Sequence, residues 1–162
     1  MSRRIFVALL TAVCLLVGCG NNQLYPEGKN ITCKDLAFTI PGDFVDMSTE
    51  DSAEDADFMY GRKTLIFQGL AEEKAKLQTM TLAQYTDYVI SGNKLPCTAA
   101  PSGEGYLFTY EKPVADTVYA YTVATYETDG YFWVLQFFGP TADVQENQPE
   151  IDIILESIRK NT

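Results

Sequence analysis

The stretch VYAYTVATYETDGYFWVLQFF, residues 118–138, decides the fold, because two β-prone runs flank Asp129-Gly130. Asp-Gly is typical of the two-residue type I′ turn, whose central residues both need φ > 0. Such a turn predicts the pairs Tyr126–Trp133, Ala124–Leu135, Thr122–Phe137, Glu127–Phe132, Thr125–Val134 and Tyr121–Phe138. Both faces of this hairpin are mainly apolar, so we expect it at the centre of a sheet that is covered on both sides.

A helix near the C-terminus is predicted to cover one face of the hairpin. Pro149 suits a helix start, and an apolar stripe follows it at helical spacing. The stripe consists of Ile151, Ile154, Leu155 and Ile158, with Asp152, Glu156 and Arg159 turned away. One hairpin face carries the small residues Ala120, Thr122 and Ala124, which would let a helix approach closely. We therefore expect Trp133 to be buried, packed with Tyr126 and with this helix.

The remaining elements follow from periodicity and turn residues. A helix over 81–91 is predicted by a capping box of Thr81 and Gln84, with Gly92 as its C′ residue. The expected strands are 36–40, 58–61, 64–70 and 106–110, a loop is expected over 93–105, and 141–148 is expected to form a separate helical turn. This order predicts an α+β domain in which an antiparallel sheet is flanked by helices.

The first eighteen residues are typical of an export signal. Arg3-Arg4 precedes an apolar stretch, 5–17, that is too short to span a bilayer comfortably. Residues 16–19, LVGC, resemble the lipobox of bacterial lipoproteins, in which the cysteine is acylated and becomes the first mature residue. We therefore predict a lipoprotein signal peptide over 1–18 and lipidation at Cys19. The expected location is the extracytoplasmic side of a bacterial cell membrane, with an ordinary signal peptide as the alternative.

The rest of the chain is predicted to form a polar tether, 19–30, and a single α+β domain, 31–162. The chain carries 12 Lys and Arg against 22 Asp and Glu, a net charge of −10. Such a charge repels nucleic acid, so the expected partners are the lipid bilayer, through the acylated cysteine, and a protein.

Two further cysteines, Cys33 and Cys97, lie in the predicted domain. An exported location permits a disulfide between them, which would stabilise the fold by roughly 4 kcal/mol if chain entropy alone is counted. The alternative is two separate buried thiols, because a bridge requires that the two Cα atoms lie close together. The bridge is the favoured prediction.

The chain contains no histidine. This excludes Ser-His-Asp and Cys-His catalysis and the usual metal sites with His ligands. The chain also lacks a glycine-rich loop of the Walker or dinucleotide type. Neither an enzyme nor a cofactor is therefore predicted. A pair of carboxyl groups across a cleft could still serve a glycosidase, but no pair stands out among the many acids.

Residues 43–57 are dense in acid: Asp43, Asp46, Glu50, Asp51, Glu54, Asp55 and Asp57. Carboxylate oxygens bind Ca²⁺, but residues 51–57 lack the spacing and the turn glycine of an EF-hand loop. A solvated loop is the favoured interpretation, and a calcium site is the alternative.

Three stretches carry a resemblance to a known family: 38–44 (FTIPGDF), the hairpin over 119–138, and 151–158 (IDIILESI). In these stretches and in its order of elements, the chain resembles the PsbP/Mog1-like superfamily, in particular its small bacterial lipoproteins. The resemblance implies an α/β/α sandwich and no shared enzymatic activity. Members act as extrinsic photosystem subunits, as partners of a small GTPase or as exported lipoproteins, and no functional motif of theirs maps onto this chain residue by residue.

The function predicted from these observations is a non-catalytic, membrane-anchored extracytoplasmic module that binds or stabilises another protein. The alternative is a ligand-binding or carboxylate-using module that acts on cell-wall glycans. A flat sheet covered on both sides would favour the first prediction, and exposed aromatic residues lining a concave pocket would favour the alternative.

Overall fold

The computed structural model describes residues 27–49, 55–77 and 79–161, so Cys19 and the signal segment lie outside the described residues. The strands are β1 (Lys29–Cys33), β2 (Leu36–Ile40), β3 (Val45–Asp46), β4 (Phe58–Arg62), β5 (Leu65–Glu73), β6 (Ala100–Ser102), β7 (Gly105–Val114), β8 (Thr117–Glu127), β9 (Tyr131–Pro140) and β10 (Arg159–Lys160). The helices are a short 3-10 helix (Lys74–Lys76), α1 (Leu82–Gly92), α2 (Thr141–Glu146) and α3 (Gln148–Glu156). None of these helices is long and apolar enough to cross a membrane.

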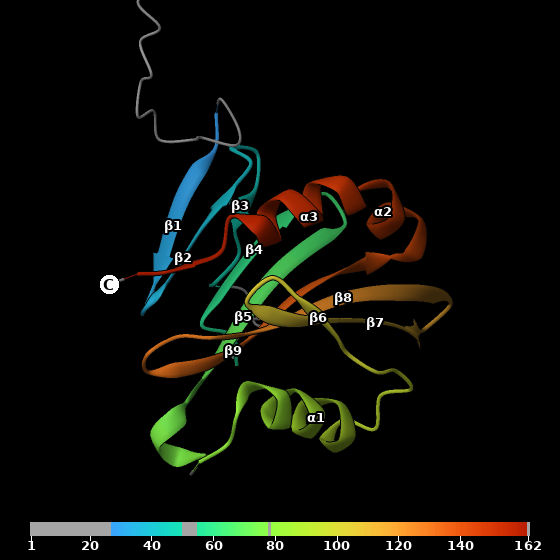
Figure 1. Ribbon diagram of the computed structural model, residues 1–162. Helices are drawn as coiled ribbons and strands as arrows, with labels where there is room; N and C mark the ends of the chain where they lie inside the picture. Colours follow the sequence, from blue (N-terminus) through green and yellow to red (C-terminus); the bar gives the residue numbers. More distant parts are fainter. Residues whose placement is uncertain (1–26, 50–54, 78, 162) are drawn as a thin grey trace, which may run out of the picture.

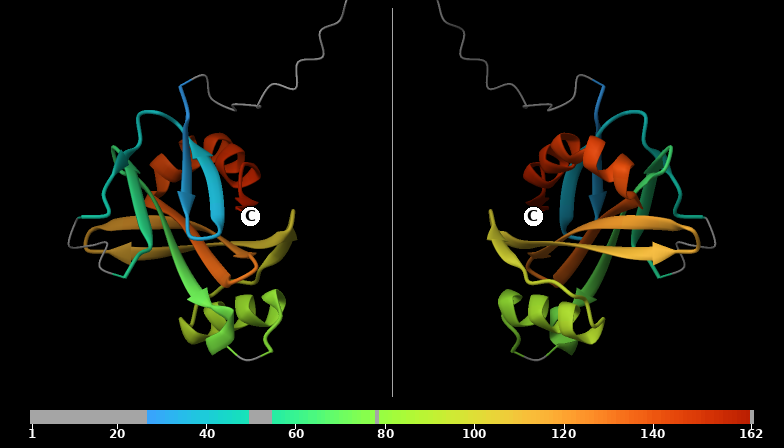
Figure 2. Two further views of the ribbon diagram at one scale, coloured as in Figure 1. Left: turned by 90° about the vertical axis from the view of Figure 1, so that its left-hand side faces the viewer. Right: turned by 90° about the vertical axis from the view of Figure 1, so that its right-hand side faces the viewer.

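The strands form two antiparallel sheets. The larger has seven strands in the order β3-β4-β5-β9-β8-β7-β6, and the smaller has three in the order β1-β2-β10. Helices α2 and α3 and the small sheet lie over one face of the large sheet, while α1 lies against the other face (Figure 1). Figure 2 shows the same separation from two further sides. The predicted α+β class is confirmed, and its single antiparallel sheet is divided into two.

The predicted hairpin is the centre of the large sheet. Strands β8 and β9 pair in the predicted register throughout, and β9 is the fourth of the seven strands. The predicted turn type is wrong, because neither Asp129 nor Gly130 has a positive φ. Contacts from distant segments hold this turn instead: Gly130 N donates to Asp35 Oδ2 at 2.9 Å, and Lys74 N donates to Gly130 O at 3.0 Å. Tertiary contacts here override the local preference of Asp-Gly.

The main core lies between the large sheet, the small sheet and the two C-terminal helices. Trp133 is fully buried in it, as predicted, and it faces Tyr126 across the hairpin. Ile151 and Ile154 of the predicted stripe reach the same core and are also fully buried. A helix approaches the small residues on β8, as predicted, but it is α2, and Ala120 and Ala124 pack against this core.

The other face of the large sheet is only partly covered by α1. The helix begins with the predicted capping box, in which Thr81 Oγ1 accepts from Gln84 N and Gln84 Oε1 accepts from Thr81 N at 2.9 Å. From this helix only Tyr85 and Thr86 are buried. Tyr85 stacks on Phe132 with ring centroids 4.7 Å apart. Much of this sheet face, including Gln68, Leu70, Val134 and Gln136, is half-buried, so the prediction of a sheet covered on both sides holds only in part.

Edge strands account for most of the elements that the sequence did not predict. β1 begins at Lys29, inside the segment expected to be tether, and pairs with the whole length of β2. β6 lies in the segment expected to be loop and is exposed throughout. An edge strand has one free side and few buried residues, so it lacks the apolar alternation that identifies an inner strand.

The predicted disulfide is absent, because Cys33 and Cys97 are both free thiols. Cys33 packs against the main core on the α3 side, with its Sγ 3.7 Å from Asp57 O. Cys97 lies between α1 and β6, close to Tyr110 on the opposite face of the large sheet. The sheet therefore separates the two thiols. Burial and the Asp57 carboxylate raise the pKa of Cys33, which makes its thiolate less available.

Candidate functional site

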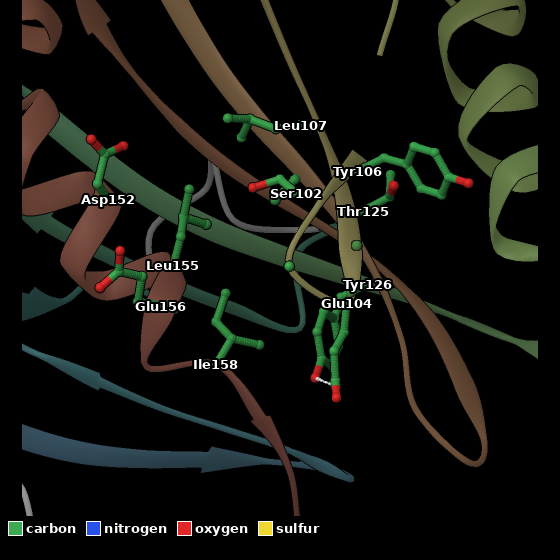
Figure 3. A pocket seen from close by; sticks show the side chains of 13 residues that line it. Ser102, Glu104, Tyr106, Leu107, Thr125, Tyr126, Asp152, Leu155, Glu156 and Ile158 are labelled. Carbon is green, nitrogen blue, oxygen red and sulfur yellow. Dashed lines mark hydrogen bonds between the residues drawn. The ribbon is translucent and has the colours of Figure 1, made fainter. Parts of the chain in front are cut away.

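A pocket of about 540 Å³ opens where the β6–β7 turn, β8 and the C-terminal end of α3 meet (Figure 3). These elements meet because β6 pairs only with the first residues of β7, and because α3 lies over the face of the large sheet on which Ala124 of β8 packs against the core (Figure 1). The pocket is lined by Ser102, Gly103, Glu104, Gly105, Tyr106, Leu107, Ala124, Thr125, Tyr126, Asp152, Leu155, Glu156 and Ile158.

The interior of this pocket is apolar. Leu107 and Ala124 form a cross-strand pair on the sheet side. Leu155, from the predicted helix stripe, and Ile158, just beyond the end of α3, close the opposite side. All four side chains are half-buried rather than fully buried, so apolar surface remains accessible from solvent. Apolar surface that stays partly exposed in a concave site is a source of binding free energy.

The rim of the pocket is acidic. Glu104 in the β6–β7 turn lies on one side, and Asp152 and Glu156 on α3 lie on the other (Figure 3). Glu104 Oε2 accepts a hydrogen bond from the Tyr126 hydroxyl at 2.6 Å. Burial, together with this bond and the Glu104 charge, raises the pKa of Tyr126 to about 12, so its hydroxyl stays protonated and keeps donating at neutral pH.

Basic residues lie near the rim without pairing with it, since Arg159 and Lys160 line an adjoining hollow together with Glu104. Within the part of the chain that the structure describes, Glu104, Asp152 and Glu156 form no ion pair. Asp152 and Glu156 are four residues apart on one helix, where like charges repel. Glu156 is also the last residue of α3, where the helix dipole disfavours an anion. A positively charged ligand at this mouth would relieve all three effects.

Some acids elsewhere on the domain form ion pairs. Asp57 pairs with Lys34 at 2.5 Å, and the Arg62 guanidinium pairs with both carboxylate oxygens of Glu150. Burial alone would lower the pKa of Arg62, but the bonds to Glu150 and the nearby Asp43 raise it, so Arg62 stays charged. Among the described residues, the rim carboxylates differ from Asp57 and Glu150 in forming no ion pair.

The acid-dense segment 43–57 is described in part, because residues 50–54 lie outside the described residues. Three of its four described acids serve separate contacts: Asp43 pairs with Arg62, Asp46 accepts from Ser48 N, and Asp57 accepts from Ala71 N. Among the described residues, no group of three or more His, Cys, Asp or Glu is placed to hold a metal ion.

The pocket residues were only partly visible in the sequence. Asp152 and Glu156 were identified as the solvent side of the C-terminal helix, but nothing in the sequence placed Glu104 opposite them. The like-charge pair at a spacing of four, close to a helix end, is the signal that points to this rim. Of the predicted site residues, Cys19 lies outside the described residues, and Cys33 and Cys97 are not brought together.

Comparisons with known proteins give a likeness in fold. No family model matches the chain, and no curated protein matches it. The solution structure of cyanobacterial PsbP (CyanoP) from Synechocystis sp. PCC 6803 is similar, with a TM-score of 0.55 and 12% identity over 90% of this chain and 98% of that one. The chain has a PsbP-like fold.

A second solved structure shares this PsbP-like fold. A crystal structure of a protein from Bacteroides thetaiotaomicron VPI-5482 matches with a TM-score of 0.58 and 13% identity. The match covers 84% of this chain and 49% of that protein, so the chain spans about half of its length. At these identities both likenesses concern the fold alone.

Proposed function

We propose that this protein is a non-catalytic, membrane-anchored module that binds a protein partner on the extracytoplasmic side of a bacterial membrane. The observation that carries the proposal is the pocket between β7, β8 and α3, with its apolar interior and its acidic rim of Glu104, Asp152 and Glu156. A PsbP-like fold is compatible with this role, because it provides a rigid sheet on which such a surface can be held.

The partner segment that fits this pocket carries an apolar side chain next to Lys or Arg. The apolar side chain would contact Leu107, Leu155 and Ile158, which supplies most of the affinity. The basic groups would pair with the rim, which supplies specificity and a faster association rate. The net charge of −10 acts in the same direction, because it attracts basic surfaces and repels acidic ones.

Anchoring is supported by the sequence features of the first nineteen residues. Cys19 at the predicted lipobox would carry acyl chains, and two such chains hold a protein at a membrane stably. The segment between Cys19 and the start of β1 at Lys29 spans at most about 35 Å when fully extended. A partner of the pocket would therefore lie close to the bilayer surface, as a membrane protein or a membrane-associated protein does.

Charge reversal at the rim tests this proposal. Asp152→Lys with Glu156→Lys should abolish recovery of the partner from native membranes, and recovery by the unchanged protein should fall as NaCl is raised. The matched control is Glu111→Lys with Asp116→Lys, which makes the same charge change at exposed positions around the β7–β8 turn. Equal recovery by both double variants would contradict the proposal.

A further inference from the structure

A groove of about 560 Å³ lies on the opposite face of the large sheet from the acidic pocket. Its wall is α1, and its floor is the part of β5, β9, β8 and β7 that α1 leaves uncovered. Strands β5, β9 and β8 each pair on both sides, so their backbone groups are used within the sheet. A ligand in this groove is therefore recognised by side chains rather than by main-chain pairing.

Two glutamines face each other on this floor. Gln68 on β5 lies directly opposite Gln136 on β9, and both side chains are half-buried. Neither amide forms a hydrogen bond with another residue in the described ranges, and both line the groove. Each amide offers two donors and an acceptor. Val123 and Phe108 continue the same row across the sheet but are buried. In the neighbouring row, the half-buried pair Leu70 and Val134 places apolar surface beside these amides.

The next row of the sheet carries stacked aromatic rings. Phe138 stacks on Tyr121 at 5.6 Å, and Tyr121 stacks on Tyr110 at 4.6 Å. Because the rings stack on one another, they present their edges and their phenol hydroxyls outward. Burial, with the neighbouring Tyr121, raises the pKa of Tyr110 to about 12, and burial raises the pKa of Tyr121 as well. Both hydroxyls are therefore neutral hydrogen-bond donors at physiological pH.

Charge is nearly absent from the groove. The charged residues in its lining are Glu72 and Lys112, and they lie at opposite ends, since Glu72 pairs with Phe132 and Lys112 belongs to the row of Pro140. Between them the lining offers amides, hydroxyls and apolar side chains. This chemistry suits an uncharged ligand that carries many hydroxyl and amide groups along an extended chain.

We propose that this groove binds a neutral glycan bearing N-acetyl groups. The acetamide group of such a sugar donates and accepts one hydrogen bond each, which matches the opposed amides of Gln68 and Gln136. The sugar hydroxyls meet the phenol group of Tyr110, and the apolar faces of the sugar rings meet the half-buried side chains of Leu70 and Val134. This site is independent of the acidic pocket, because the large sheet lies between the two.

Binding of a soluble N-acetylglucosamine tetramer to the purified protein, measured by titration calorimetry, tests the inference. We expect saturable binding that Gln68→Leu and Gln136→Leu each weaken by about tenfold, as the loss of hydrogen bonds to an uncharged ligand predicts. The matched control is Gln145→Leu on α2, an exposed glutamine on the other side of the large sheet. An unfolding curve for each variant shows that the groove is intact.

The site is also separated from the proposed protein-binding pocket. The double variant Asp152→Lys with Glu156→Lys should bind the tetramer with unchanged affinity, whether or not it still binds a protein partner. Absence of saturable binding at millimolar tetramer would overturn the inference. Equal affinity in the glutamine variants and in the control would also overturn it.

Discussion

The carboxylate of Asp35 accepts a hydrogen bond from the indole of Trp133, with Asp35 Oδ1 3.3 Å from Trp133 Nε1. The same carboxylate accepts from Thr128 Oγ1 at 2.8 Å and from Gly130 N at 2.9 Å. Asp35 lies between β1 and β2, so it joins the small sheet to the turn of the central hairpin. Asp35 therefore provides a partner for the only polar side-chain atom of Trp133, the largest fully buried side chain among the described residues, and it also fixes the turn.

Asp35 should make stability depend on pH in the acid range. Burial alone would raise the pKa of Asp35, but the bonds from Gly130, Thr128 and Trp133 outweigh it and lower the pKa. The unfolded state therefore binds the proton more tightly, so this contribution is present above the unfolded pKa of about 4 and is lost as pH falls through the folded pKa. Asp35→Asn should lower the free energy of unfolding by about 2 kcal/mol at pH 7.

Urea unfolding of the two proteins at a series of pH values from 7 downward measures this effect. The difference in the free energy of unfolding between the two proteins should shrink in the acid range. Protonation removes the charge of Asp35 in the natural protein, and Asp35→Asn removes the same charge in the variant. A difference that stays constant down to the lowest pH at which both proteins fold would argue against the role given to Asp35.

Trp133→Ala should lower the free energy of unfolding by about 3–5 kcal/mol, because Trp133 is fully buried among aromatic and aliphatic neighbours. The control is Tyr88→Ala on α1, whose side chain is 53% exposed and which should cost less than about 1 kcal/mol. Trp133 is the only tryptophan, so its emission reports this one site. Blue-shifted emission that resists acrylamide quenching is expected, and red-shifted emission that quenches freely would place the ring in solvent.

Arg62→Lys should lower the free energy of unfolding by about 1–2 kcal/mol although the charge is kept. The two terminal nitrogens of the Arg62 guanidinium form a fork that contacts both carboxylate oxygens of Glu150. The guanidinium also donates to Asn147 Oδ1 at 2.7 Å, and these contacts connect β4 to α3. A lysine has one ammonium group and does not reproduce this fork. Lys76→Arg at an exposed ion pair is the control and should leave the denaturation midpoint nearly unchanged. Equal denaturation midpoints for Arg62→Lys and Lys76→Arg would show that the guanidinium contacts of Arg62 do not stabilise the fold.

The thiols of Cys33 and Cys97 should both be accessible to alkylation without reduction, since the structure holds them apart. Intact-mass measurement of the denatured mature protein is expected to show two added alkyl groups. In the native protein Cys33 should react slowly, because burial and the Asp57 carboxylate raise its pKa. A measured mass without added alkyl groups would instead support the disulfide between Cys33 and Cys97 that the sequence alone favours.

Cys19→Ser should release the protein from the membrane fraction or leave an uncleaved precursor, because the acylated cysteine is the proposed anchor. Fractionation and labelling with palmitate follow the change. Serine in place of Cys14, inside the apolar stretch of the predicted signal, is the matched control and should leave both unchanged. Continued labelling and unchanged processing of the Cys19 variant would refute the anchor.

The sequence predicted what depends on local pattern and missed what depends on tertiary contact. The register of the hairpin and the burial of Trp133 follow from alternation, and the start of α1 follows from the Thr81 capping box. The turn type at Asp129 depends on contacts from Asp35 and Lys74, which are distant in the sequence. No local pattern carries that information, and the same limit applies to the disulfide, because Cα separation across a sheet is not a sequence property.

The acidic pocket also combines features that follow from local sequence pattern with features that depend on tertiary contacts. The apolar stripe of α3 was visible in the sequence, and it places Leu155 in the pocket interior. The position of Glu104 was not visible, because it depends on the edge strand β6, which has no apolar alternation. The candidate site therefore combines the helix α3, which the sequence predicts, with the edge strand β6, which it does not predict.

The measurement that tests the central claim most directly is photo-cross-linking at the rim of the pocket. A photoreactive amino acid in place of the exposed Ser102, which lines the pocket, should form an adduct with one discrete protein in native membranes, through a peptide with Lys or Arg beside an apolar residue. The same amino acid in place of the exposed Gln145 on α2 should form no such adduct. Adding Asp152→Lys with Glu156→Lys should remove the Ser102 adduct. An adduct that survives this charge reversal, or equal adducts from the two positions, would contradict binding of a basic partner at this pocket.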